Sequence, residues 1–298
     1  MKVGFIGVGN MGGPMCRNIV KRSNHQVSVF DLNAAAVKTC TDLGATAAKS
    51  IADVTKGADV VMTSLPMPKD VEAVTLGDGG ILANIGKGQT YIDLSTNAPS
   101  MVKKIGAAMA AKGIAMLDAP VSGGTARAQS GDLSVIVGGE RAVFDKCQDL
   151  FTAMGSRSFH VGPLGSGLAM KLVNNMLVQV NTVAVAEAMV LGVKAGLDPQ
   201  MIYDVVRVST GASAAWEMRV PRILAGDYEP GGTVDISYKD QELETAFAKR
   251  LGVPVLLANV TQQVYQMARA QGLNKQDGSA VVKVFERLAG VTVKEGNK

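Results

Sequence analysis

The feature that most constrains this chain is its start, where an apolar run of strand length leads directly into the pattern G-x-G-x-x-G. The apolar run is Val3–Ile6. The glycines of the pattern follow at Gly7, Gly9 and Gly12, and a helical pattern comes next. In a dinucleotide-binding turn the first glycine permits the tight turn, the second lets the backbone approach a pyrophosphate, and the third allows close packing of helix on strand. The start of the helix adds unpaired N–H groups and a positive dipole end.

A second strand pattern, Val27–Phe30, ends at Asp31, about 20 residues on, where an acid should meet the adenosine ribose. Strand, glycines, helix, strand and acid in this order predict a nicotinamide dinucleotide site. The alternative is a plain strand-to-helix turn in another α/β protein. Asp31 favours NAD over NADP because its carboxylate accepts from the ribose 2′-OH and repels a 2′-phosphate. The residues that follow, Leu32 and Asn33, include no arginine.

Bulk properties exclude several classes of protein. The 298 residues are 47% hydrophobic and 19% charged, which is typical of a globular protein. No uncharged apolar segment reaches the roughly 18 residues of a membrane span, and no cleavage-type segment follows the first strand, so we expect a cytoplasmic protein. The net charge of +4 is scattered, which argues against nucleic-acid binding. Three separated cysteines and two histidines predict neither a disulfide framework nor a metal site.

The order of elements predicts two domains. Up to about residue 160, buried strand patterns alternate with helical ones, which indicates a doubly wound parallel sheet of the Rossmann type at residues 1–163. Two of the expected strands are residues 134–137 and 158–161, with one helix over 141–154 between them. Residues 164–298 show only helical patterns and predict an all-helical domain for substrate and dimerisation, joined by a long helix from about residue 167.

Ligands of open α/β sheets bind beyond the carboxyl ends of the strands. The residues expected there include Leu65 and Pro66, Thr96, and Ser122-Gly123-Gly124. Ser122 offers a hydroxyl and the two glycines offer unobstructed N–H groups, which suits a carboxylate. The alternative at Ser122–Gly124 is a plain loop with a glycine turn.

A polar cluster is expected at the start of the long helix. Lys171, Asn174 and Asn175 lie at i, i+3 and i+4 and therefore share one face, among apolar neighbours. A lone lysine usually extends to water, but two adjacent amides favour a site for a hydroxyl or carbonyl group. Lys239 and Asp240, early in a later helix, are a further candidate pair, with Lys239 placed to reach over a cofactor.

These motifs, in this order, resemble the β-hydroxyacid dehydrogenase family, which includes 3-hydroxyisobutyrate dehydrogenases and tartronate semialdehyde reductases. The resemblance covers nearly the whole chain and rests on residues 4–12, 118–124, 165–175 and 239–240. It argues against the longer phosphogluconate branch, which has His-Asn where this chain has Asn174-Asn175. It also argues against imine reductases, which lack the lysine at position 171.

The resemblance implies a role for each motif. Lys171 would be catalytic, and the substrate would be held by Ser122, Gly123, Gly124, Asn174 and Asn175. The cofactor would be held by Gly7, Gly9, Asn10, Met11, Gly12, Asp31, Leu65, Pro66, Thr96 and Lys239. One departure is Gln241, where relatives usually have leucine. Selection of the substrate side chain is expected from loops around residues 209–222, and Trp216, Arg219 and Arg222 are candidates for it. The alternative for these three residues is a role in helix packing or as solvated charge.

The expected reaction is hydride transfer between NAD and a small 3-hydroxy acid such as 3-hydroxyisobutyrate or glycerate, with Lys171 as general acid or base. The alternatives are a reductase of small aldehydes, such as succinic semialdehyde or glyoxylate, and a dinucleotide-binding module without catalysis. The resemblance also implies a homodimer or homotetramer.

Overall fold

The computed structural model describes residues 1–294 and divides the chain into two compact units, Met1–Lys171 and Leu172–Lys298, with the division inside a long helix. The first unit contains every named strand of the described residues. These are β1 (Lys2–Ile6), β2 (Gln26–Phe30), β3 (Thr46–Ala47), β4 (Val60–Thr63), β5 (Thr90–Asp93), β6 (Ala115–Asp118), β7 (Val121–Ser122), β8 (Ser134–Gly138) and β9 (Arg157–Gly162).

The strands form one sheet in the order β3-β2-β1-β4-β5-β6-β8-β7, with β9 paired to β8. The pairs from β3 to β6 are parallel, and the order reverses between β1 and β4, the position at which doubly wound sheets bind nucleotides. The predicted Rossmann-type sheet is therefore confirmed.

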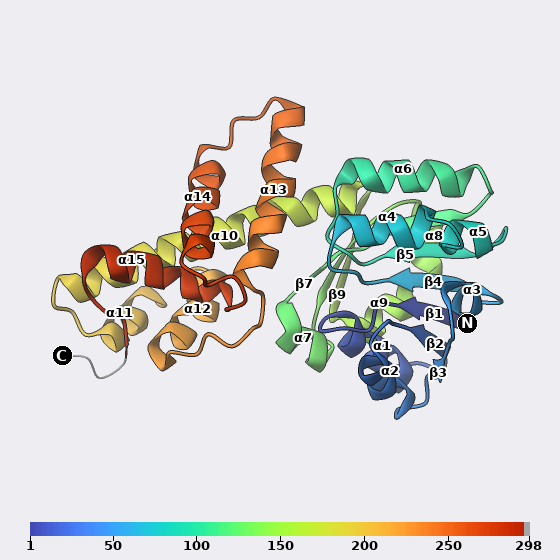
Figure 1. Ribbon diagram of the computed structural model, residues 1–298, viewed down its shortest axis with the longest axis horizontal. Helices are drawn as coiled ribbons and strands as arrows, with labels where there is room; N and C mark the ends of the chain where they lie inside the picture. Colours follow the sequence, from blue (N-terminus) through green and yellow to red (C-terminus); the bar gives the residue numbers. More distant parts are fainter. Residues whose placement is uncertain (295–298) are drawn as a thin grey trace. The chain divides into compact units, whose positions relative to one another are not determined.

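Helices cover both faces of this sheet (Figure 1). One face packs against α1 (Gly12–Arg22), α2 (Ala34–Thr41), α7 (Gly124–Ser130), α8 (Arg141–Lys146) and α9 (Gln148–Met154). The other packs against α3 (Ile51–Thr55), α4 (Pro68–Leu76), α5 (Ile81–Asn84) and α6 (Pro99–Ala110). Strands buried on both faces are uniformly apolar, which is why residues 60–62 and 91–92 contain no polar alternation.

Two details of the first unit differ from the expectation. Strand β8 runs antiparallel to β6 and β7, because α7 ends at Gly131 in the left-handed conformation and the chain turns back after only one short helix. The single helix expected over residues 141–154 is broken at Cys147, whose backbone leaves the helical region (φ −98°, ψ 6°) and separates α8 from α9.

The long helix α10 (Ser166–Lys194) links the two units. It is long and apolar enough to cross a membrane by length and composition alone, although only 39% of its most apolar window is buried. The other helices of the second unit are α11 (Pro199–Val206), α12 (Ala214–Ala225), α13 (Val234–Leu251), α14 (Leu256–Ala270) and α15 (Val282–Ala289), with a 3-10 turn η1 at Gly278–Val281. Figure 1 shows α13 and α14 side by side as a pair.

Helix α12 corrects the expectation of loops around residues 209–222. Ser213 caps this helix by accepting the N–H of Trp216, and Trp216, Val220 and Ile223 join the apolar core of the second unit. The sequence pattern is weakened there by Pro221, which lies inside the helix. The second unit is otherwise all-helical, as predicted.

Candidate active site

The glycine turn after β1 has the geometry that a pyrophosphate requires. Gly7 has φ +86°, and a Cβ at either Gly7 or Gly12 would collide with a backbone carbonyl, Ser64 O for Gly7 and Gly7 O for Gly12. A Cβ at Gly9, in contrast, would meet no atom within 4 Å. Gly9 therefore leaves open space in front of the turn, into which a ligand can approach the backbone.

The start of α1 and the end of β2 complete this cradle. Helix α1 has no side-chain cap and no acidic residue in its first turn, so its positive end is available to an anion. Asp31 Oδ2 accepts the N–H of Val8 at 2.8 Å, and Oδ1 accepts the N–H of Asn33 at 2.8 Å. The carboxylate thus lies directly beside the glycine turn, as the ribose of a dinucleotide requires. These residues fit the predicted cofactor.

The expected edge residues follow β4 and β5. The N–H of Leu65 donates to Ser95 Oγ at 2.9 Å, which joins the loop containing Leu65 and Pro66 to the loop containing Ser95 and Thr96. Both loops therefore lie at the same carboxyl edge as the glycine turn, because β1, β4 and β5 are parallel neighbours.

A row of polar residues crosses the sheet just beneath this edge. Thr63 is in register with Asp93, Asp93 with Asp118, and Asp118 with Gly138. Both carboxyls are buried, and burial raises the pKa of each, in the case of Asp118 to about 6. Thr63 Oγ1 and the N–H of Ser95 donate to Asp93 Oδ1 at 2.9 and 3.0 Å.

Asp118 accepts two backbone hydrogen bonds from the segment that begins α10. The N–H of Gly165 donates to Oδ1 and the N–H of Leu168 to Oδ2, each at 2.7 Å. The sequence motif 118–124 contains this aspartate, but the side-chain role was not predicted. An acid that closes an apolar strand, as both Asp93 and Asp118 do, is the signal that could have revealed the row.

Ser122 and the two glycines come four to six residues after Asp118, beyond the carboxyl end of β6. Ser122 ends the short strand β7, in register with Ser134, and is therefore not a free loop residue. Gly123 (φ +138°) and Gly124 (φ +70°) both have backbone conformations that other residues rarely adopt. A Cβ at Gly123 would also lie 2.9 Å from Arg127 Cβ.

Lys171, Asn174 and Asn175 lie in α10, and both Lys171 and Asn175 are buried. Within the second unit, Asn175 Nδ2 donates to Asp240 Oδ2 at 2.8 Å, and Lys239 Nζ lies 2.7 Å from Asp240 Oδ1. Asp240, which had no predicted role of its own, thus joins Lys239 to Asn175. The carboxylate fixes the orientation of the Asn175 amide, because it accepts only from the NH2 side.

Comparison with known proteins identifies the family. Residues 2–162 match the model described as the NAD binding domain of 6-phosphogluconate dehydrogenase, and residues 165–285 match that of the NAD-binding domain of NADP-dependent 3-hydroxyisobutyrate dehydrogenase. The chain is 40% identical to 2-(hydroxymethyl)glutarate dehydrogenase of Eubacterium barkeri, over 99% of this chain and 98% of that protein. It is 38% identical to the NAD-dependent L-serine dehydrogenase of Pseudomonas aeruginosa, over 97% and 99%.

A solved structure of 3-hydroxyisobutyrate dehydrogenase from Salmonella typhimurium superimposes with a TM-score of 0.87 at 31% identity, covering 96% of this chain and all of that one. The chain belongs to the β-hydroxyacid dehydrogenase family. It is an NAD-binding oxidoreductase that acts on the CH–OH group of hydroxy acids.

Three side chains considered for substrate selection have partners inside the second unit of this dehydrogenase. Trp216 is buried and its Nε1 donates to Tyr203 O at 3.3 Å. The guanidinium groups of Arg219 and Arg222 lie 2.8 and 3.1 Å from the two oxygens of Asp277. These contacts give all three residues a structural role in the packing of α12.

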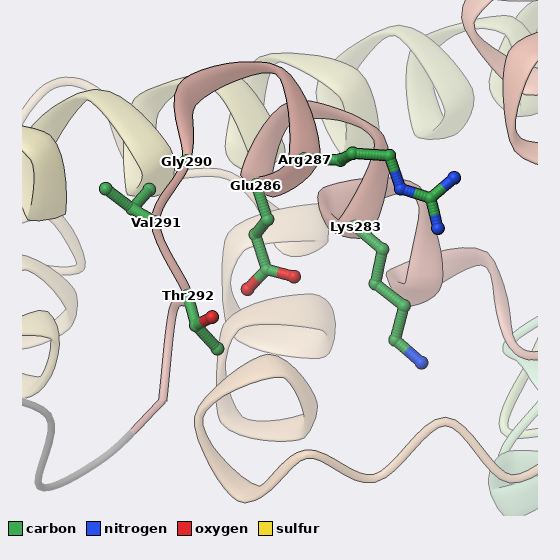
Figure 2. Close-up of a pocket in the computed structure, with 6 residues that line it drawn as sticks. All are labelled: Lys283, Glu286, Arg287, Gly290, Val291 and Thr292. Atoms are coloured by element: carbon green, nitrogen blue, oxygen red, sulfur yellow. The ribbon is translucent and has the colours of Figure 1, made fainter.

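A surface hollow is present on α15, and none of its lining residues is a predicted site residue (Figure 2). Its lining consists of Lys283, Glu286, Arg287, Gly290, Val291 and Thr292. Lys283 Nζ donates to Gln276 Oε1 at 2.7 Å and lies over the ring of Tyr228, while Glu286 accepts the N–H of Val293. Both charges are thus held by contacts within the second unit.

Proposed function

We propose that this dehydrogenase transfers a hydride between NAD and a small 3-hydroxy acid, with Lys171 as the general acid or base. The observation that carries the proposal is the polar face of α10. A buried lysine lies there one helical turn before Asn175, whose amide is oriented by Asp240 at 2.8 Å. A buried amine and a buried, oriented amide on one helix face suit a hydroxyl or carbonyl group.

The proposed cofactor contacts are the glycine turn and the neighbouring edge. They comprise Gly7, Gly9, Asn10, Met11, Gly12, Asp31, Leu65, Pro66, Thr96 and Lys239. Bound NAD supplies the hydride acceptor for oxidation of the alcohol. The position of Asp31 beside the turn supports a preference for NAD over NADP, since a 2′-phosphate would meet a carboxylate there.

Residues of the chain itself bind the substrate and transfer the proton. Ser122 Oγ and the N–H groups of Gly123 and Gly124 hold the substrate carboxylate. Lys171 Nζ takes the hydroxyl proton in oxidation and returns it to the carbonyl oxygen in reduction. Asn174 and Asn175 orient the same oxygen by hydrogen bonding.

The names of the relatives narrow the substrate class. The substrates named for 2-(hydroxymethyl)glutarate dehydrogenase, L-serine dehydrogenase and 3-hydroxyisobutyrate dehydrogenase all have a CH2OH group on the carbon that bears a carboxylate. They differ only in the third substituent of that carbon. We therefore propose a primary alcohol β to a carboxylate as the substrate of this chain.

The test is a set of initial rates of NAD reduction with those three acids, in the wild type and in Lys171→Ala. We expect one acid to be oxidised and Lys171→Ala to lose about 10²–10⁴-fold in kcat while NAD still binds, because general acid–base catalysis contributes that much. Near-normal turnover in Lys171→Ala would overturn the role of the lysine. Activity only with semialdehydes and NADH would instead indicate an aldehyde reductase.

We also propose a homodimer or homotetramer. Helix α14 exposes Leu256, Leu257 and Val260, and α10 exposes Val173 and Leu177, so both helices present apolar side chains that a second subunit could cover. Light scattering coupled to gel filtration tests this, with Leu256→Glu/Val260→Glu expected to lower the mass to that of one chain. A wild-type monomer would contradict it.

We also propose two domains and a cytoplasmic location. Residues 1–163 form the cofactor domain and residues 164–298 form the substrate and dimerisation domain, which separate expression of each segment and NAD titration would test. A cytoplasmic location is supported by three buried cysteines, none of them in a disulfide, as is typical of a reducing compartment. Fractionation of cells with an antibody to the chain tests it.

A further inference from the structure

Asp118 is placed to control where α10 begins. Its two carboxylate oxygens each accept one backbone N–H, from Gly165 and from Leu168, across 47 and 50 residues of sequence. Those two donors flank Ser166, the first residue of α10. One buried side chain at the end of β6 therefore fixes both the approach to the helix and its first turn.

The surrounding backbone is shaped to fit this carboxylate. A Cβ at Gly138 would collide with Asp118 Oδ1, and a Cβ at Gly167 would lie 2.9 Å from Asp118 Oδ2 and 2.6 Å from Asp118 O. Both positions therefore need glycine for the helix start to pack against β6 and β8. Such close packing leaves the start of α10 little freedom to move relative to the sheet.

The chemistry of the contact also suits a carboxylate. The first N–H groups of a helix have no partners inside the helix, and a carboxylate at this end is favoured by the dipole. Hydrogen bonds from two N–H groups to two charged oxygens are among the stronger ones in proteins. An asparagine at position 118 could accept only one of them, because its NH2 group would face the other donor.

Lys171 follows Leu168 by three residues in the same helix, so the position of its amine depends on how the first turn is held. We infer that Asp118 is a positioning residue, whose contact with Gly165 and Leu168 sets the place of Lys171 relative to the sheet edge that binds the cofactor. The inference rests on the role proposed above for Lys171. A displacement of a catalytic group by about 1 Å can cost about 100-fold in rate.

The experiment is a double-mutant cycle of Asp118→Asn and Lys171→Ala, assayed with the best acid of the panel. We expect Asp118→Asn to lower kcat by about 10–100-fold and to change the Kd of NAD by less than about twofold. In the Lys171→Ala background the same change should cost less than about threefold, because the residue that it positions is gone. Asp145→Asn, an exposed acid paired with Arg141, is the control and should leave kcat unchanged.

Three results would overturn the inference. They are a kcat of Asp118→Asn within about threefold of wild type, losses that multiply in the double variant, and a loss of NAD binding that parallels the loss of kcat. If Asp118→Asn does not fold, Asp118→Glu keeps the charge but adds a methylene at the helix start, and the same criteria apply to it. Full activity of Lys171→Ala alone would refute the proposed function instead, so the two failures are distinguishable.

Discussion

The carboxylate of Asp31 accepts the backbone N–H of Val8 at 2.8 Å, so the end of β2 is bonded directly to the glycine turn after β1. The other oxygen accepts the N–H of Asn33, whose own side chain caps α2 by accepting from Ala35 and Ala36. Asp31 thus has a structural role in the turn as well as the proposed role in binding the ribose.

This double role predicts a specific outcome for Asp31→Ser. We expect the Kd of NAD to rise at least about tenfold, since a charge-assisted hydrogen bond to the ribose is lost and the turn loses one of its supports. The efficiency with NADP should fall less, or rise, because repulsion of the 2′-phosphate is removed. The measurement is the ratio of kcat/KM with NAD to kcat/KM with NADP. The control is Asp42→Ser, which changes an exposed acid paired with Lys38. An unchanged NAD to NADP ratio would contradict the assignment.

The raised pKa of Asp118 predicts how stability depends on pH. Burial raises this pKa from 3.8 to about 6, so between these values the folded chain binds more protons than the unfolded chain. The contribution of Asp118 to the free energy of unfolding therefore falls as pH rises from about 4 to about 6, and it is constant above about pH 6. The total change in this free energy is on the order of 3 kcal/mol.

Urea unfolding of the wild type and Asp118→Asn at about pH 5 and about pH 7.5 isolates this effect. We subtract the free energy of unfolding of the variant from that of the wild type at each pH. This difference should be larger at the lower pH, by on the order of 1 kcal/mol. A difference that is the same at both pH values would show that Asp118 titrates normally in the folded chain.

Local signals and long-range contacts differ in how well the sequence reveals them. The glycine turn, Asp31 and the long helix with Lys171 were predictable, because each is encoded within a few neighbouring residues. The antiparallel direction of β8 was not, since it depends on a turn after α7 and on which neighbour is available. The acid at the end of the apolar strand β6 signals a buried carboxyl at position 118, but its partners are backbone N–H groups about 50 residues away, which residue types do not identify.

Gln241 provides a test of stability in the second unit. Its side chain is 1% exposed, and within the described residues neither amide atom has a hydrogen-bond partner. An unsatisfied buried amide costs about 1–3 kcal/mol, so Gln241→Leu should raise the free energy of unfolding by about that amount. Urea titration measures the change, with Gln263→Leu, an exposed glutamine in α14, as the control. A loss of stability in Gln241→Leu would show that the amide is satisfied in solution.

Asp277 is the centre of the polar packing that holds α12, and its removal should be costly without affecting specificity. Burial raises its pKa, but the charge of Arg219 and the hydrogen bonds from Ser279 outweigh that effect, so the net pKa is lowered. This stabilisation is present above about pH 4 and is lost as pH falls through the lowered pKa.

Asp277→Asn leaves Arg219 as a buried charge without its counter-ion. The substitution should lower the free energy of unfolding in urea at neutral pH by about 3–5 kcal/mol. The folded variant should keep the wild-type ranking of substrates, and Asp204→Asn, an exposed acid on α11, should change neither property. A changed ranking of substrates in Asp277→Asn would indicate that α12 takes part in substrate selection, because Arg219 and Arg222 are the groups that lose their partner in this variant.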